Sequence, residues 1–143
     1  MPARGSGVHH VDLAVGDVDR SVAFYLDLLG PLGWRVTDRY PTYRGTEDVV
    51  YLGCEGPALG LRRADGGSHR YYDVGIEHLA FEVDRRDEVD GAHARCISRG
   101  ATIHFAPARS PASCKTSFKL TPVHSAQLRR PTRSDAVFPN GFL

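Results

Sequence analysis

A chain of 143 residues with 41% hydrophobic residues is long enough for one buried core and too apolar for a disordered protein. Its net charge of +1 is divided unevenly, because residues 1–106 hold 12 Arg against 16 acidic residues, whereas residues 107–143 hold six basic residues and one acidic residue. This basic end lacks a helical pattern or an aromatic-rich groove, which argues against nucleic-acid binding. No apolar run approaches the roughly 20 residues that span a bilayer, and no signal-peptide pattern follows Met1, so we expect a cytoplasmic protein.

The first predicted strand is residues 8–15, where apolar and polar residues alternate. Val11, Leu13 and Val15 share one face, which should pack under a helix. His10 and Asp12 share the other face with Ala14, and that face should look into something wetter.

A helix should follow, because Asp17 is suited to cap it and an apolar stripe begins at residue 22. Gly30 is expected to end this helix in a left-handed conformation. The residues of the stripe, at positions i, i+3, i+4 and i+7, are Val22, Tyr25, Leu26 and Leu29.

The next segments predict a compact sheet that ends in a linker. A strand should begin over residues 34–37, and residues 39–47 (RYPTYRGTE) are expected to be a loop that carries Tyr43. Residues 49–52 and 59–63 predict a hairpin around the turn Cys54-Glu55-Gly56-Pro57. The glycines and polar residues of 64–74 are typical of a linker.

The same plan returns in residues 76–105, which makes the chain an internal repeat. His78 matches His10, 68 residues earlier, and Gly100 matches Gly30, 70 residues earlier. His78, Ala80 and Glu82 should face away from Leu79, Phe81 and Val83. Asp84 is expected to cap the second helix, Gly100 to end it, and its buried stripe should be Val89, Ala92, Cys96 and Ile97.

The end of the chain is harder to interpret. A strand is predicted at residues 101–105, and short strands are possible at residues 116–121 and 136–138. Two hypotheses stay open for the part from about residue 107: it folds as a divergent hairpin, or it is an altered terminus that reads from a shifted frame.

Both halves resemble the vicinal-oxygen-chelate superfamily, the glyoxalase, bleomycin resistance protein and extradiol dioxygenase group. The first half does so through HHVDLAVGDVDRSVAFYLDLLG and the second through GIEHLAFEV and a helix that ends in R-G-A. The resemblance implies an α+β fold of two βαβββ modules that form an open barrel around a cleft. Module one would be residues 8–64, the linker 65–74 and module two 75–143, within a single domain and a homodimer.

The resemblance also implies a site. His10 and His78 match the first-strand metal ligands, which would hold a divalent ion such as Fe, Mn, Zn, Ni or Co. The strand-four carboxylate of module one would fall near Gly60, which has no side chain, and the corresponding last-strand Glu would lie beyond Leu143. The plainer alternative is that the two histidines line a cleft without binding metal.

Two functions follow. The first is an enzyme that uses a divalent metal on a small molecule with vicinal oxygens, as a lyase, an isomerase or a ring-cleaving dioxygenase, with no catalytic residue assigned. The alternative is a non-catalytic binding or resistance protein for an antibiotic-like or aromatic molecule. Candidate substrate-binding residues in either case are Asp12, Glu82, Tyr43 and Arg62, although strand-surface charges and a solvated loop are the plainer interpretation.

Overall fold

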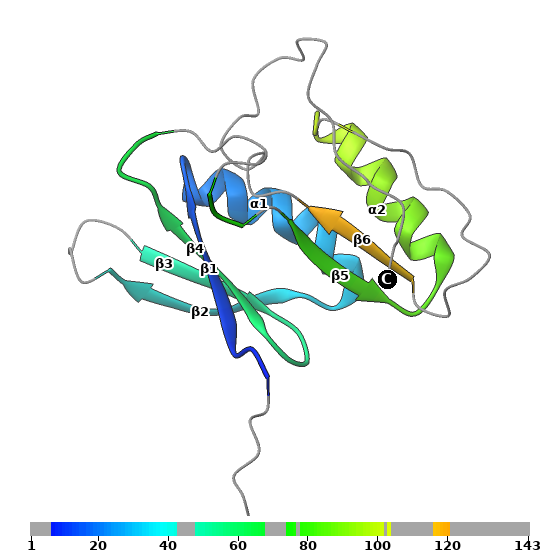
Figure 1. Ribbon diagram of the computed structural model, residues 1–143, viewed down its shortest axis with the longest axis horizontal. Coiled ribbons are helices and arrows are strands. Elements are labelled where there is room, and N and C mark those ends of the chain that lie inside the picture. Colours follow the sequence, from blue (N-terminus) through cyan, green and yellow to red (C-terminus); the bar gives the residue numbers. More distant parts are fainter. Residues whose placement is uncertain are drawn as a thin grey trace, which may run out of the picture. The chain divides into compact units, whose positions relative to one another are not determined.

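The computed structural model describes residues 7–42, 48–67, 74–76, 78–101, 103 and the backbone of 116–120. The chain divides into two compact units, Met1–Asp65 and Gly66–Leu143. Each unit is described by itself (Figure 1).

The first unit is one helix on a four-stranded sheet (Figure 1). The strand order is β1-β4-β3-β2; β1 runs parallel to β4 and the other neighbours are antiparallel. The unit is therefore a βαβββ module, as predicted. Its elements are β1 (His10–Val15), α1 (Val18–Leu29), the short 3-10 helix η1 (Gly30–Leu32), β2 (Arg35–Pro41), β3 (Asp48–Gly53) and β4 (Ala58–Arg63).

The core of this unit lies between α1 and the sheet. α1 contacts β3 and β4, whose Val50, Leu52, Leu59 and Leu61 are buried. Each large apolar side chain buried here stabilises the fold by about 1.5–3 kcal/mol. The predicted helix stripe is confirmed except for the half-buried Leu26, and the buried apolar residues of α1 are Val22, Phe24, Tyr25, Leu28 and Leu29.

The predicted start of α1 and its end at Gly30 are confirmed, but the left-handed conformation predicted for Gly30 is wrong. Asp17 is the N-cap, and its Oδ1 accepts a hydrogen bond from the Arg20 backbone N at 2.9 Å. Gly30 has a φ of −54°, and the chain continues into η1 because Pro31 fixes a helical φ. The left-handed residue is Gly33, with a φ of +88°.

The predicted loop at residues 39–47 is wrong in its first part. β2 continues through Pro41, with a bulge between Val36 and Asp38, and every residue of the strand is exposed. An edge strand that is exposed on both faces carries polar residues and Pro, which is the composition of a loop. Residues 43–47 are outside the described residues. The hairpin of β3 and β4 is confirmed.

The second unit contains β5 (Leu79–Val83), α2 (Arg86–Ser98) and β6 (Thr116–Leu120). β5 and β6 are antiparallel, and α2 contacts both (Figure 1). The strand predicted at 116–121 is confirmed as far as Leu120. Ala101 and Ile103 are not in a strand, and the rest of 101–105, like 136–138, is outside the described residues.

α2 differs from the prediction at both its N-terminus and its buried face. The N-cap is Arg85 and not Asp84, because the Glu88 side chain accepts a hydrogen bond from the Arg85 backbone N at 2.9 Å. Ile97 is 55% exposed, so it does not belong to the buried stripe of Val89, Ala92 and Cys96. Gly100 follows the helix with a φ of +71°, as expected. No helix in the described part of the chain is long and apolar enough to cross a membrane.

Candidate functional site

The candidate site is the face of the first sheet that alternates away from its buried core. Leu13 and Val15 of β1 are buried, whereas His10 is exposed and Asp12 is half-buried. The register places Asp12 beside Gly60 of β4, and Gly60 beside Tyr51 of β3. These three residues therefore form one row across three neighbouring strands.

Gly60 has no side chain, and the side chains beside it in that row occupy the space that one would fill. A Cβ at residue 60 would overlap the Asp12 Oδ1 atom and would lie 2.8 Å from Tyr51 Cε1. Strands two apart in a sheet are separated by about 9–10 Å, so side chains from β1 and β3 meet only if the strand between them is bare. Gly60 is the bare position that brings the two side chains together.

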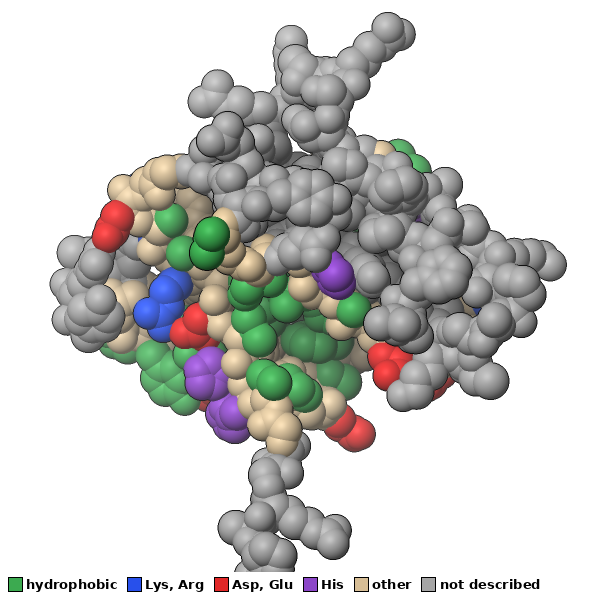
Figure 2. All heavy atoms as spheres, viewed as in Figure 1, with side chains coloured by type: hydrophobic (Ala, Val, Ile, Leu, Met, Phe, Trp, Pro, Cys, Tyr) green, Lys and Arg blue, Asp and Glu red, His purple; other side chains and the backbone are tan. Residues whose placement is uncertain are grey.

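The Asp12 carboxylate is the centre of the polar contacts on this face. Arg62 donates through Nη2 to Asp12 Oδ2 at 2.6 Å, and the Tyr51 hydroxyl lies 3.5 Å from the same oxygen. Asp12 Oδ1 is buried and has no hydrogen-bond partner among the described residues. His10 Nε2 lies 3.9 Å from this oxygen. On the face seen in Figure 2, histidine side chains lie beside an acidic and a basic side chain.

Aromatic rings continue this face from β1 to β2. The His10 and Tyr51 rings meet edge to face with centroids 5.7 Å apart, and the Tyr51 and Tyr40 rings are 6.1 Å apart. At the other end, His9 Nδ1 lies 2.8 Å from His10 Nδ1. Edge-to-face pairs at these distances are favourable, and they fix the rings relative to one another. The result is an aromatic row of four rings, His9, His10, Tyr51 and Tyr40.

Both tyrosine hydroxyls of the row are held in their protonated form. Burial raises the pKa of Tyr51, and the negative charge of Asp12 raises it further. The hydrogen bond that the Tyr40 hydroxyl donates to Asp38 at 3.0 Å, together with the charge of Asp38, raises the pKa of Tyr40. Near neutral pH the row therefore presents neutral phenols.

Three of the predicted site residues, His10, Asp12 and Arg62, lie together. Tyr43 is outside the described residues. His78 is half-buried next to β5 and Glu82 is exposed on β5, in the second unit. That His10 and His78 become neighbours stays a prediction.

The prediction from sequence missed Tyr51 and the contact made by His9. Tyr51 alternates with the buried Val50 and Leu52, so the period of β3 could have placed it on the His10 face. Tyr40 lay in a segment interpreted as a loop. Alternation along the strand predicts that His9 lies on the face opposite to His10, so the contact between their rings was not expected.

One family model matches residues 7–126 and is described as the Glyoxalase/Bleomycin resistance protein/Dioxygenase superfamily. The chain belongs to this superfamily. No curated protein matches the sequence closely enough to count as a relative.

Solved structures share the superfamily fold with this chain. A glyoxalase-like protein of Bacillus halodurans has a TM-score of 0.63 at 23% identity, over 83% of this chain and 90% of that one. The fosfomycin resistance protein FosX of Listeria monocytogenes has a TM-score of 0.58 at 18% identity, over 87% and 96%. Lactoylglutathione lyase of Agrobacterium tumefaciens has a TM-score of 0.52 at 23% identity, over 85% and 90%. At these identities the likeness establishes the fold alone.

The superfamily resemblance implies a metal, and module one by itself does not fit one. Its candidate site offers two imidazoles, His9 and His10, whose Nδ1 atoms already face each other at 2.8 Å, and one carboxylate, Asp12, which binds the Arg62 guanidinium at 2.6 Å. A stable divalent site needs three or four protein ligands, and Gly60 contributes none. Within the described residues, no group of three or more His, Cys, Asp or Glu side chains could hold an ion.

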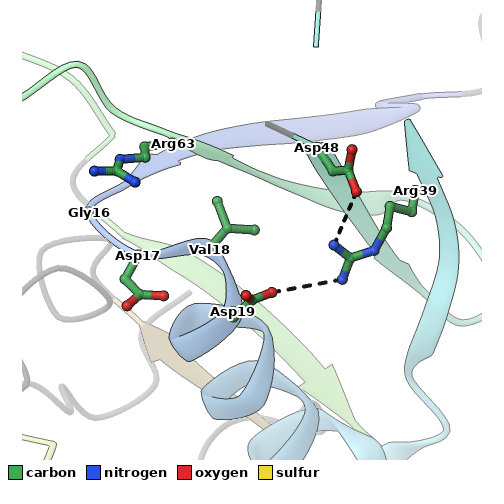
Figure 3. Close-up of a pocket in the computed structure, with 7 residues that line it drawn as sticks. All are labelled: Gly16, Asp17, Val18, Asp19, Arg39, Asp48 and Arg63. Atoms are coloured by element: carbon green, nitrogen blue, oxygen red, sulfur yellow. Dashed lines mark hydrogen bonds and ion pairs between the residues drawn. The ribbon is translucent and has the colours of Figure 1, made fainter. Parts of the chain in front are cut away.

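A separate pocket of about 400 Å³ lies at the N-terminus of α1 (Figure 3). Arg39 crosses it, 3.3 Å from an Asp48 oxygen and 3.9 Å from an Asp19 oxygen. Its charged groups largely bind one another, and its lining contains none of the predicted site residues. The residues that line it are Gly16, Asp17, Val18, Asp19, Arg39, Asp48 and Arg63.

Proposed function

We propose that this superfamily member binds a small aromatic molecule on the face of β1, β3 and β4 that carries Asp12, Gly60 and Tyr51, and that module one does so without a metal ion. The observation that carries the proposal is that three rings of the aromatic row, those of His10, Tyr51 and Tyr40, span the bare position at Gly60. A flat ring can stack on or against these rings, and each such contact is favourable by about 0.5–1.5 kcal/mol beyond the area that it buries.

The charges on the face support an aromatic ligand that carries a polar group. Asp12 and Arg62 neutralise each other, so the face presents a dipole and not a strong net charge. The Arg62 side chain is 37% exposed, so part of it is accessible beside the rings. This combination of a ring surface and one oriented polar pair is typical of small-molecule sites.

Binding of 2-naphthoate, followed by its fluorescence, tests the proposal. Tyr51→Leu should weaken binding at least fivefold, because it removes the central ring of the row, and Arg62→Gln should weaken it by a similar factor. Arg63→Gln is the matched control, because Arg63 is the next residue of β4 and its side chain alternates to the other face. Equal effects of the Arg62 and Arg63 substitutions, or no effect of Tyr51→Leu, would contradict the proposal.

The second candidate is a metal-dependent lyase, isomerase or ring-cleaving dioxygenase that uses His10 and His78. It is supported by the corresponding placement of the two histidines, at the starts of β1 and β5, and by the Mn(II) in the structure of FosX from Listeria monocytogenes. Metal analysis of freshly purified protein separates the candidates. A binder should carry less than about a tenth of an equivalent of Fe, Mn, Ni, Zn or Co, whereas the enzyme should carry close to one.

A further inference from the structure

The side chains of His9 and His10, at the N-terminal end of β1, share one hydrogen bond. His9 Nδ1 and His10 Nδ1 are 2.8 Å apart, which is a hydrogen-bond distance. One of the two atoms must donate and the other must accept, so a neutral His10 has two possible forms. In one form its Nδ1 accepts from His9 and its Nε2 carries the proton; in the other its Nδ1 donates and its Nε2 carries a lone pair.

Asp12 distinguishes these two forms. His10 Nε2 faces Asp12 Oδ1 at 3.9 Å, and this oxygen is buried and lacks a hydrogen-bond partner among the described residues. A proton on Nε2 is attracted to the carboxylate, whereas a lone pair on Nε2 would repel it. The other carboxylate oxygen is already bound to Arg62, so the carboxylate is held in this orientation.

We propose that Asp12, whose carboxylate lies over Gly60, is a positioning residue that keeps a proton on His10 Nε2. With that proton, His10 donates a hydrogen bond to an oxygen of the ligand and does not bind a metal through this nitrogen. This inference rests on the proposed function for its ligand. Both neutral His10 in this form and protonated His10 carry a proton on Nε2. The ligand class that follows is an aromatic molecule with a carbonyl, carboxylate or phenolate oxygen.

The Asp12 carboxylate occupies the space that a side chain at residue 60 would fill. A methyl group at residue 60 would overlap Asp12 Oδ1 and would crowd Tyr51. Gly60→Ala should therefore push the carboxylate away from His10 without changing any charge. Asp12→Asn should have the same effect on His10 by removing the charge itself.

Long-range ¹H–¹⁵N correlation spectra of labelled protein test the positioning directly, because the protonated and unprotonated nitrogens of neutral imidazole resonate far apart. His10→Phe identifies the His10 signals by their loss. In spectra recorded at alkaline pH, His10 of the wild type should show the Nε2–H form. Both Asp12→Asn and Gly60→Ala should raise the population of the Nδ1–H form. Asp38→Asn is the matched control, since this carboxylate binds Tyr40 and not His10. A wild-type Nδ1–H form, or an unchanged form in both variants, would overturn the inference.

Two probes test the ligand class separately. His10→Phe keeps a ring and removes the donor, so the affinity for 2-naphthoate should fall by roughly three- to tenfold, the effect of one hydrogen bond. The affinity for 2-naphthylmethylammonium, which offers no acceptor, should not fall. If wild type has the Nε2–H form and binds neither probe, the proposed function fails and the positioning by Asp12 stands. Equal losses for the two probes would overturn the acceptor-oxygen assignment.

Discussion

The helix of the first unit and the helix of the second unit are stabilised in different ways. α1 begins at an Asp cap and buries five large apolar side chains against its sheet, whereas α2 buries Val89, Ala92 and Cys96. The surface of α2 is instead tied by exposed ion pairs, Arg85 with Asp87 at 2.9 Å and Arg86 with Asp90 at 3.3 Å. Exposed pairs contribute little to stability. Within the described residues, α1 buries more large apolar side chains than α2 does.

The comparison also explains why the candidate site can sit in module one. The missing side chain at Gly60 and the Asp12 oxygen that has no hydrogen-bond partner in the described part of the chain both reduce stability. The well-packed helix on the other face of the same sheet offsets that cost. Substitutions in the two modules can break or sharpen this contrast.

The largest expected effect is from truncating the core of module one. Leu28→Ala should lower the free energy of unfolding by about 2–5 kcal/mol, because Leu28 is 1% exposed and leaves a cavity. Ile97→Ala, at a residue of α2 that is 55% exposed, should change the free energy of unfolding by less than about 0.5 kcal/mol. Urea denaturation measures both. A loss below about 1 kcal/mol for Leu28→Ala would contradict the packing contrast.

Glycine substitutions should have opposite signs within module one. Gly60→Ala should destabilise the fold by about 1–3 kcal/mol, because the methyl group meets Asp12 and Tyr51. Gly30→Ala should be neutral or stabilise by up to about 1 kcal/mol, because its φ is −54° and no atom lies within 4 Å of an added Cβ. Thermal unfolding compares the pair. A stabilising Gly60→Ala would show that residue 60 is not a gap that neighbouring side chains fill.

The two helix starts should respond differently to the loss of an aspartate. Asp17→Ala should cost about 1 kcal/mol, since it removes the side-chain cap of α1. Asp84→Ala should cost less than about 0.5 kcal/mol, since Glu88 caps the Arg85 backbone N in its place. Denaturant midpoints of the two variants make the test, and equal costs would restore Asp84 as a cap.

The smallest expected effect is at acid pH in module two. The hydrogen bond from Arg85 lowers the pKa of the Asp87 carboxyl below its usual value. A lowered pKa in the folded state adds stability above the unfolded pKa of about 3.9, and that stability is lost as the pH falls through the folded value. Asp87→Asn should therefore reduce the drop in thermal midpoint between about pH 5 and pH 3. A larger drop in the variant would reverse the sign.

Sequence periodicity was enough for most of module one, because β1, α1 and the hairpin of β3 and β4 each have one clearly apolar face. It failed where local signals conflict with position. β2 has the composition of a loop because it is an exposed edge, and Gly30 is followed by Pro31, which moves the left-handed turn to Gly33. For the site, alternation identified His10 and Asp12, and the resemblance identified Gly60 as a missing ligand position. Neither could predict that the Asp12 carboxylate fills that gap, because the register between β1 and β4 joins residues 48 positions apart.

The central claim is that the aromatic row above Gly60 binds its ligand without metal. The most direct measurement is the Kd of 2-naphthoate for chelator-treated wild-type protein, before and after addition of one equivalent of Mn(II) and then of Fe(II) or Zn(II). We predict that the Kd stays within about threefold across these additions, since no ligand contact depends on an ion. Binding that appears only after metal is added would contradict the account.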